Sequence, residues 1–455
     1  MRTHAAYFRL LAAALVAPLT VAVTGTASLG QSAPAPGPSA PSVSLSLHDA
    51  MTMALANNLT YKAAAADVGS AEGQLIQARG SSYPSVSAGY SYVHTQDPAF
   101  FLVPIAQPSG PPVFQKAFFS ATNINNVNAT LQYAIYTGGA VQAAIGAAAA
   151  GFSASESNYA AVRADVLDST TTAYYALVLT RQTATITDQA VDVGKQNLST
   201  SQQLYEAGSA AKADVLKQQV TLANAQVATI RAHNASDLAN ARLANVLDIN
   251  LNSYINPTEP LGITPPVYSL PELLQDAQTR RPEVAAAIDA VTIAEKAVQE
   301  ARAGTLPAIG LEISEASSKP NFVNVPQPQL SETLFAVWRF FDGGLTHGKV
   351  VQAQSAVDKA KINLHQLRNQ VDLQVRDAYF NYQAAQAAVT AADSARTSAA
   401  ESLRVTQLRY RAGVGTSLEL SDALLAYTQT QVQYASALAD QSTTLVSLQR
   451  AAGLL

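Results

Sequence analysis

Two short stretches decide the fold that this sequence predicts: Arg409-Tyr410-Arg411-Ala412-Gly413 and, in the first half of the chain, Leu204-Tyr205-Glu206-Ala207-Gly208. Both interrupt long segments without proline, residues 113–256 and 329–455. Proline costs roughly 3 kcal/mol inside a helix, and the alanine, glutamine, leucine and arginine of these segments favour helix. A glycine can take the left-handed conformation that ends a helix and reverses the chain. We therefore expect two long helical hairpins.

The similarity extends outward from these turns, which indicates an internal repeat. Tyr136-Thr137-Gly138-Gly139 corresponds to Phe341-Asp342-Gly343-Gly344 at the same separation in sequence as Tyr205 and Tyr410, which we call the shorter offset. Ala78-Arg79 before Pro84 corresponds to Ala301-Arg302 before Pro307 at a larger separation, the longer offset. The two offsets differ by 18 residues, which places an insertion in the first copy, at the proline-rich residues 96–119, where we expect a loop. We predict a first repeat over 45–256 and a second over 257–455, each with a helix, two strands and a long helical hairpin.

Four segments alternate apolar and polar residues, the pattern that is typical of strands. They centre on residues 86–93, 127–135, 309–314 and 334–340, and each pair precedes one of the long helices. No stretch after the N-terminal region carries the ~18 uninterrupted apolar residues of a membrane helix. A mature chain that crosses a membrane would therefore do so as a closed β-barrel, with apolar side chains outside and polar ones inside.

The composition and the N-terminus limit the function. The 455 residues carry a formal net charge of −4 and no cysteine, and no basic stripe suggests a nucleic-acid partner. No nucleophile, base or metal-ligand cluster indicates an enzyme or a cofactor. Arg2 and Arg9 precede an apolar stretch, which predicts a signal peptide over residues 1–30, followed by a disordered Pro/Ala linker over 31–44.

Taken together, residues 45–455 resemble the TolC-type family of outer-membrane efflux proteins. The resemblance implies a mainly α chain with a β-barrel part, which assembles as a homotrimer. Its twelve-stranded barrel in outer-membrane lipid would continue into a long coiled-coil α-helical tunnel across the periplasm of a Gram-negative cell. The function implied is a passive conduit for efflux or type I secretion, docked to a periplasmic adaptor and an inner-membrane transporter. The alternative is a periplasmic coiled-coil scaffold or adaptor without a pore.

The resemblance also implies where the periplasmic gate lies. Glu419 and Asp422 share one face of the returning helix at spacing i, i+3, and they match two family acids that form a cation-attracting constriction; the other interpretation is a solvated face. Tyr410 matches a position that ties the gate shut, although a purely structural role at the turn is equally consistent with its counterpart Tyr205. Asp214, the counterpart of Glu419, would either join this latch or stabilise a helix N-terminus. The periplasmic adaptor would dock at the tips of the two hairpins, which are the turns at Gly208, Gly413 and Gly415. Gly415 stands where some members carry an arginine of the latch.

Overall fold

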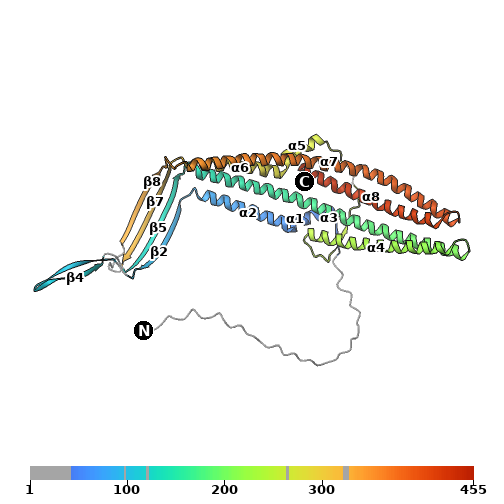
Figure 1. Cartoon of the computed structure of the whole chain (residues 1–455), viewed down its shortest axis with the longest axis horizontal. Helices are drawn as coiled ribbons and strands as arrows, with labels where there is room; N and C mark the ends of the chain where they lie inside the picture. Colours follow the sequence, from blue (N-terminus) through green and yellow to red (C-terminus); the bar gives the residue numbers. More distant parts are fainter. Residues whose placement is uncertain (1–41, 97–98, 119–121, 263–265, 321–326) are drawn as a thin grey trace, which may run out of the picture. The chain divides into compact units, whose positions relative to one another are not determined.

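The computed structural model describes residues 42–96, 99–118, 122–262, 266–320 and 327–455 (Figure 1). The predicted signal peptide and residues 31–41 of the predicted linker lie outside this range. In the described part, no helix combines the length and the apolar character that crossing a membrane requires.

Helices make up most of the described chain, as the absence of proline predicts. The helices are α1 (Leu47–Asn57), α2 (Leu59–Gly80), α3 (Ala140–Glu206), α4 (Lys212–Val246), α5 (Leu270–Arg280), α6 (Pro282–Ala303), α7 (Leu345–Arg411) and α8 (Ser417–Ala452). Helices α3 and α7 both have 67 residues, and their first residues are related by the shorter offset. Helices α2 and α6 both have 22 residues, and their first residues are related by the longer offset. At ~1.5 Å per residue, α3 and α7 are each about 100 Å long.

A pair of glycines starts each 67-residue helix. Gly138 and Gly139 have φ angles of 65° and 89°, and Gly343 and Gly344 have φ angles of 67° and 91°. Two consecutive residues with positive φ are strained for side chains with a Cβ atom, whereas glycine adopts this conformation freely. The glycine pairs therefore turn the chain from strand to helix at the two corresponding places.

The strands that precede α3 and α7 form one antiparallel sheet in the order β2-β5-β7-β8 (Figure 1). Their bounds are β2 (Ser85–His94), β5 (Asn123–Tyr136), β7 (Ala308–Pro320) and β8 (Gln327–Val337). Residues paired across antiparallel strands point to the same face, so the register defines two faces. The mainly apolar face carries Val86, Ala88, Tyr90, Val127, Ala129, Leu131, Leu311, Ile313, Leu330 and Leu334, together with Glu315, Ser317 and Glu332. The polar face carries Ser85, Ser87, Thr130, Gln132, Glu312, Ser314, Ser331 and Thr333.

The insertion in the first half differs from the predicted loop over 96–119. Strands β3 (Phe100–Gln107) and β4 (Gly110–Phe118) pair with each other and not with the four-stranded sheet. The runs of aromatic and β-branched residues on either side of the turn at residues 108–109 favour strand. Pro104, Pro111 and Pro112 lie in these two strands, whose outer edges are unpaired in the described residues, so a missing N–H is tolerated, and Pro108 lies in the turn.

The end of the predicted linker also differs, because strand β1 (Ser42–Leu45) already begins at Ser42. It pairs in parallel with β6 (Tyr254–Pro257), so the predicted boundary between residues 256 and 257 falls inside a strand. Leu45 is buried and faces the same core as the fully buried Ile255, and this burial orders the strand. Disorder is therefore the wrong prediction for residues 42–44.

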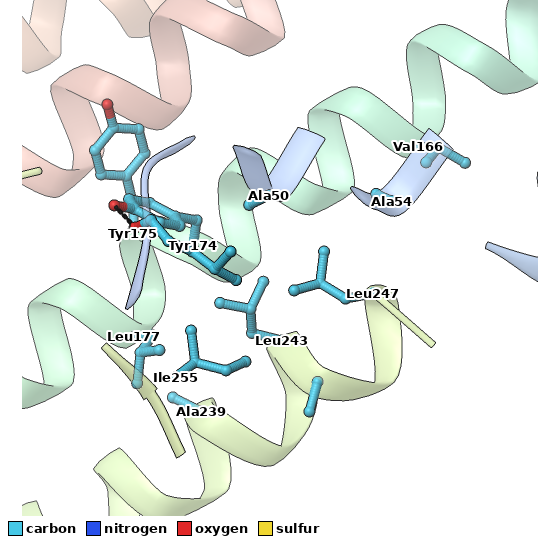
Figure 2. Close-up of a cluster of buried hydrophobic side chains, with 12 residues drawn as sticks. Ala50, Ala54, Val166, Tyr174, Tyr175, Leu177, Ala239, Leu243, Leu247 and Ile255 are labelled. Atoms are coloured by element: carbon cyan, nitrogen blue, oxygen red, sulfur yellow. Dashed lines mark hydrogen bonds between the residues drawn. The ribbon is translucent and has the colours of Figure 1, made fainter. Parts of the chain in front are cut away.

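The core of the first half holds this small sheet against α1, α3 and α4. Figure 2 shows Tyr174 of α3 beside Leu243 of α4 and Ile255 of β6, and all three side chains are fully buried. The Tyr174 hydroxyl donates a hydrogen bond to the carbonyl oxygen of Leu45 at 3.1 Å, so the polar tip of this buried ring is satisfied. A second core between α5, α7 and α8 contains Val371, Val375 and Leu448.

Candidate functional site

The two helical turns have the same backbone hydrogen bonds. After α3, Gly208 has a φ of 74°, and the N–H of Ser209 donates to the carbonyl of Leu204 at 2.7 Å. After α7, Gly413 also has a φ of 74°, and the N–H of Val414 donates to the carbonyl of Arg409 at 3.0 Å. These are the 6→1 bonds that follow a left-handed glycine at a helix end. The structure thus places Gly208 and Gly413 at the predicted chain reversals.

Gly415 closes the second turn by close packing. A Cβ atom at this position would lie 3.1 Å from the backbone nitrogen of Tyr410. Its N–H donates to the carbonyl of Arg409 at 3.2 Å, and the corresponding Ala210 donates to Leu204 at 3.1 Å. A side chain at position 415 would therefore contact the backbone of the turn closely, although the equivalent position of the first turn holds Ala210.

Tyr410 links the two hairpins. Its ring is buried in a small cluster with Leu403, Leu420 and Leu424. Its hydroxyl forms a hydrogen bond with the fully buried hydroxyl of Ser201 on α3, with 2.7 Å between the two oxygens. The corresponding Tyr205 is exposed. The two tyrosines therefore differ in environment, and of the two only Tyr410 joins α7 to α3.

A second link between the hairpins is the buried side chain of Gln218 on α4. Its amide nitrogen donates to the carbonyl of Ser417 and to the hydroxyl of Ser421 on α8, both at 3.1 Å. The hydroxyl of Thr221 lies 3.1 Å from the same Ser421 hydroxyl. The Gln218 carbonyl oxygen is buried without a hydrogen-bond partner in the described residues. These polar contacts join α4 to α8 near the turns, beside the apolar cluster of Tyr410.

Asp214 caps a helix and also contacts the other hairpin, and its part in a latch stays a prediction. Its carboxylate accepts the backbone N–H of Ala211 at 3.2 Å, which caps the N-terminus of α4. It also accepts a hydrogen bond from the hydroxyl of Ser417 at the start of α8. A carboxylate at a helix N-terminus stabilises the helix, and its second contact ties this helix to the other hairpin.

The carboxylate of Glu419 contacts residues close to it in the sequence and the side chain of Arg409. Its carboxylate accepts the backbone N–H of Thr416 at 3.3 Å, and the Thr416 hydroxyl accepts the N–H of Glu419 at 3.2 Å, which is a capping box. A nitrogen of the Arg409 guanidinium lies 4.0 Å from the same carboxylate. Both side chains are about half exposed, so this ion pair contributes at most ~1 kcal/mol.

Asp422 is exposed and lines a groove of about 240 Å³ between α3, α4 and α8. Lys217 of α4, its counterpart in the first half, lines the same groove. The two residues with opposite charge therefore share one solvent-filled space. Of the predicted site residues, Asp214, Tyr410, Glu419 and Asp422 all lie close to the turns on α4, α7 and α8.

A separate ionic cluster joins the bodies of the helices. Arg450 of α8 contacts Asp165 of α3 at 2.7 Å and Glu283 of α6 at 2.6 Å. Burial opposes ionisation of Glu283, but a hydrogen bond from its own backbone N–H and the charges of Arg450 and Arg281 outweigh it and lower its pKa. On α3, burial raises the pKa of Asp168, since desolvation outweighs the hydrogen bond from Ser447.

Sequence reasoning missed Ser201, Gln218 and Ser421. Each is a polar residue within a helix that carries many such residues, and no motif surrounds it. The informative feature is their burial against the other hairpin, which a pattern along one helix does not report. Arg450 was missed for the same reason.

Comparisons with known proteins agree with this architecture. Residues 50–248 and 273–454 match the family model described as outer membrane efflux protein. Protein CyaE of Bordetella pertussis is 28% identical over 338 residues, which cover 71% of this chain and 70% of CyaE. The alkaline protease secretion protein AprF of Pseudomonas aeruginosa is 26% identical over 57% of this chain and 56% of AprF.

The fold is also that of a solved outer-membrane channel. The crystal structure of CmeC from Campylobacter jejuni superposes with a TM-score of 0.75, at 18% identity, over 90% of this chain and 85% of CmeC. The family model spans most of the chain, in both halves. The chain belongs to the outer membrane efflux protein family, and it is accordingly an outer-membrane channel protein of Gram-negative bacteria and not an enzyme.

Proposed function

We propose that three copies of this chain form the outer-membrane conduit of a tripartite efflux or type I secretion system. Each chain would contribute its four-stranded sheet to a twelve-stranded barrel, built from two structural repeats per chain. The two longest helices, α3 and α7, and their partners would continue the barrel as a coiled-coil tunnel through the periplasm. A periplasmic adaptor and an inner-membrane transporter would meet the tunnel at the turns.

One observation carries this proposal: the sheet has one apolar and one polar face, and each of its two strand pairs leads through a glycine pair into a 67-residue helix. A membrane barrel places the apolar face against lipid and the polar face toward its lumen. A coiled-coil scaffold without a pore has no use for such a sheet. The secretion alternative within this class is favoured by AprF, whose name assigns it to the secretion of alkaline protease.

The experiment is to purify the full chain from outer membranes in detergent, measure its mass, and insert it into planar bilayers. We expect a trimer that opens discrete pores. A monomer without conductance would instead support the scaffold. Cross-linking in cells from cysteines placed at residues 209 and 414, followed by identification of the captured protein, would name the adaptor.

We further propose that Glu419 and Asp422 of three copies form a ring of six acids at the narrow periplasmic end. Its support is the exposure of Asp422 and its place beside the turn. The double variant Glu419→Gln, Asp422→Asn should weaken block of the pore by divalent cations. Asp440→Asn, an exposed acid farther along α8, is the matched control and should leave the block unchanged. Equal block in the wild type, the double variant and the control would remove these acids from the constriction.

A further inference from the structure

The four-stranded sheet ends in two strand edges that are unpaired within the described residues. Strand β2 pairs only with β5 on one side, and β8 pairs only with β7 on the other. All three ladders are antiparallel, so β2 and β8 also run in opposite directions. Strand β8 of one copy can therefore add to β2 of a second copy and continue the same antiparallel pattern. This inference rests on the assembly proposed above and concerns the seam between its copies.

The register of the two halves is the same within each strand pair. In the first half Ser85 lies opposite Gln132, and in the second half Ala308 lies opposite Val337. The longer offset, which relates Arg79 to Arg302, converts Ser85 of β2 into Ala308 of β7. The shorter offset, which relates Tyr205 to Tyr410, converts Gln132 of β5 into Val337 of β8. The offsets found between corresponding helices therefore also relate the strands.

The same two offsets give the register of the seam between copies. Inside the chain, the seam between the halves is the β5–β7 ladder, in which Val127 lies opposite Ser317. The shorter offset carries Val127 forward to Glu332, and the longer offset carries Ser317 back to His94. We propose that β8 of one copy pairs with β2 of the next in this register, which sets Glu332 directly opposite the neighbouring copy's His94.

Glu332 needs such a partner. It lies opposite Ile313, on the apolar face, with Leu330 and Leu334 two positions away on either side. It is exposed and makes no hydrogen bond or ion pair with any described residue. A charged residue on the lipid face of a membrane barrel is destabilising to a degree that depends on its depth.

His94 is suited to supply the missing partner. Its Nδ1 atom lies 2.7 Å from the side-chain oxygen of Asn123, which also accepts the Tyr92 hydroxyl at 2.9 Å. An amide oxygen only accepts hydrogen bonds, so Nδ1 donates in this contact. The Nε2 atom makes no hydrogen bond within the described residues. A carboxylate opposite this atom completes the hydrogen bonding of the ring and of Glu332 together.

Other registers place different residues opposite Glu332. A shift by one position would bring the polar face of one copy against the apolar face of the next, because successive side chains alternate between faces. A shift by two positions keeps the faces matched and sets Tyr92 opposite Glu332. Tyr92 is therefore the informative comparison.

Disulfide formation tests the register directly, because the natural chain has no cysteine. We would introduce His94→Cys with Glu332→Cys, and in separate proteins Tyr92→Cys or Val93→Cys with Glu332→Cys. Within one chain β5 and β7 lie between these two strands, which alone separates the positions by at least about 14 Å, three strand spacings. The registers separate them further along the strands, because His94 pairs with Asn123 whereas Glu332 lies level with Leu131. A disulfide needs Cα atoms about 4.4–6.8 Å apart, so any bond links two copies. We expect covalent dimers and trimers on non-reducing gels with the His94 variant, in about tenfold excess over the other two.

A stronger linkage through Tyr92, or no linkage in any pair while size measurements still show a trimer, would overturn the proposed register. A wild-type chain that is not trimeric would instead refute the proposed assembly. A second measurement needs no cysteine. His94→Glu and Glu332→His alone should each lower the temperature at which the trimer dissociates in detergent, and the double exchange should restore it. A double variant that is as unstable as the sum of the two single variants would also overturn the pairing.

Discussion

The buried hydrogen bond between Tyr410 and Ser201 allows a quantitative test of the latch. Tyr410→Phe keeps the ring within its cluster of leucines and removes only the hydroxyl that lies 2.7 Å from the Ser201 hydroxyl. Because this contact joins α7 to α3, its loss acts on the association of the hairpins. The helices themselves are expected to remain intact.

The loss of stability in Tyr410→Phe depends on the Ser201 hydroxyl, which stays buried without its partner. Removing one partner of a buried hydrogen bond costs about 1–3 kcal/mol, because the other group stays desolvated. The Ser201 hydroxyl is fully buried, but it can turn to the carbonyl of Asn197 one turn earlier in α3. We therefore take the lower part of the range, about 1–1.5 kcal/mol per chain. If separation of the hairpins opens the pore, each chain would open up to about tenfold more readily.

The assay combines single-channel recording with thermal unfolding in detergent. Tyr410→Phe should raise the open probability and lower the free energy of unfolding. Ser201→Ala should do the same, and the double variant should cost about 1 kcal/mol less than the sum, because no unpaired hydroxyl remains. Tyr205→Phe is the matched control, since its ring is 46% exposed and its hydroxyl makes no hydrogen bond in the described residues. The reasoning is refuted if Tyr410→Phe and Tyr205→Phe behave alike, or if the two single effects simply add.

Four further substitutions test other parts of the structure by thermal unfolding. Gly413→Ala should lower the free energy of unfolding by about 1–2 kcal/mol, because the φ of Gly413 is 74°. Gly69→Ala, in the exposed middle of α2, should raise it by about 0.5–1 kcal/mol. A change of the same sign in both variants would contradict this reasoning. Asp168→Asn should raise the melting temperature at pH 7.5 and change it little at pH 4. The pKa of Asp168 is raised in the fold, so its ionised form destabilises the fold as the pH rises. A lower melting temperature of the variant at pH 7.5 would count against this. Glu283→Gln should make the free energy of unfolding depend less on pH in the acid range. The pKa of Glu283 is lowered in the fold, so its ionised form stabilises the fold above about pH 4.3, and this stability is lost as the pH falls through the folded-state pKa. An unchanged dependence on pH would contradict this.

The order of helices and turns could be predicted from local signals. Proline-free segments predict the long helices, and glycines predict the reversals at Gly208 and Gly413. These signals act through the backbone of a few neighbouring residues. The predicted loop over residues 96–119 failed for a related reason. Its prolines favour a loop, but its aromatic and β-branched runs form the β3–β4 hairpin instead.

The details of the site depend on contacts that are distant in sequence. Tyr410 and Tyr205 occupy corresponding positions, yet one is buried and bonded to Ser201 and the other is exposed. The Glu419 carboxylate completes a capping box in one chain, and its place at a constriction stays a prediction. Nothing in the residues next to the two tyrosines distinguishes their environments, whereas the spacing of Thr416 and Glu419 in the sequence is that of a capping box.

The sequence by itself determined the repeated order of strands, long helices and glycine turns, since each depends on backbone preferences over a few residues. Only the tertiary structure decided which polar side chains join the two hairpins and how the strands are registered. Those choices follow from which surfaces become buried against each other, and burial is a property of the packed molecule. The hydrogen bonds of Tyr410 and Gln218 exist because α3 and α4 meet the other hairpin at these residues.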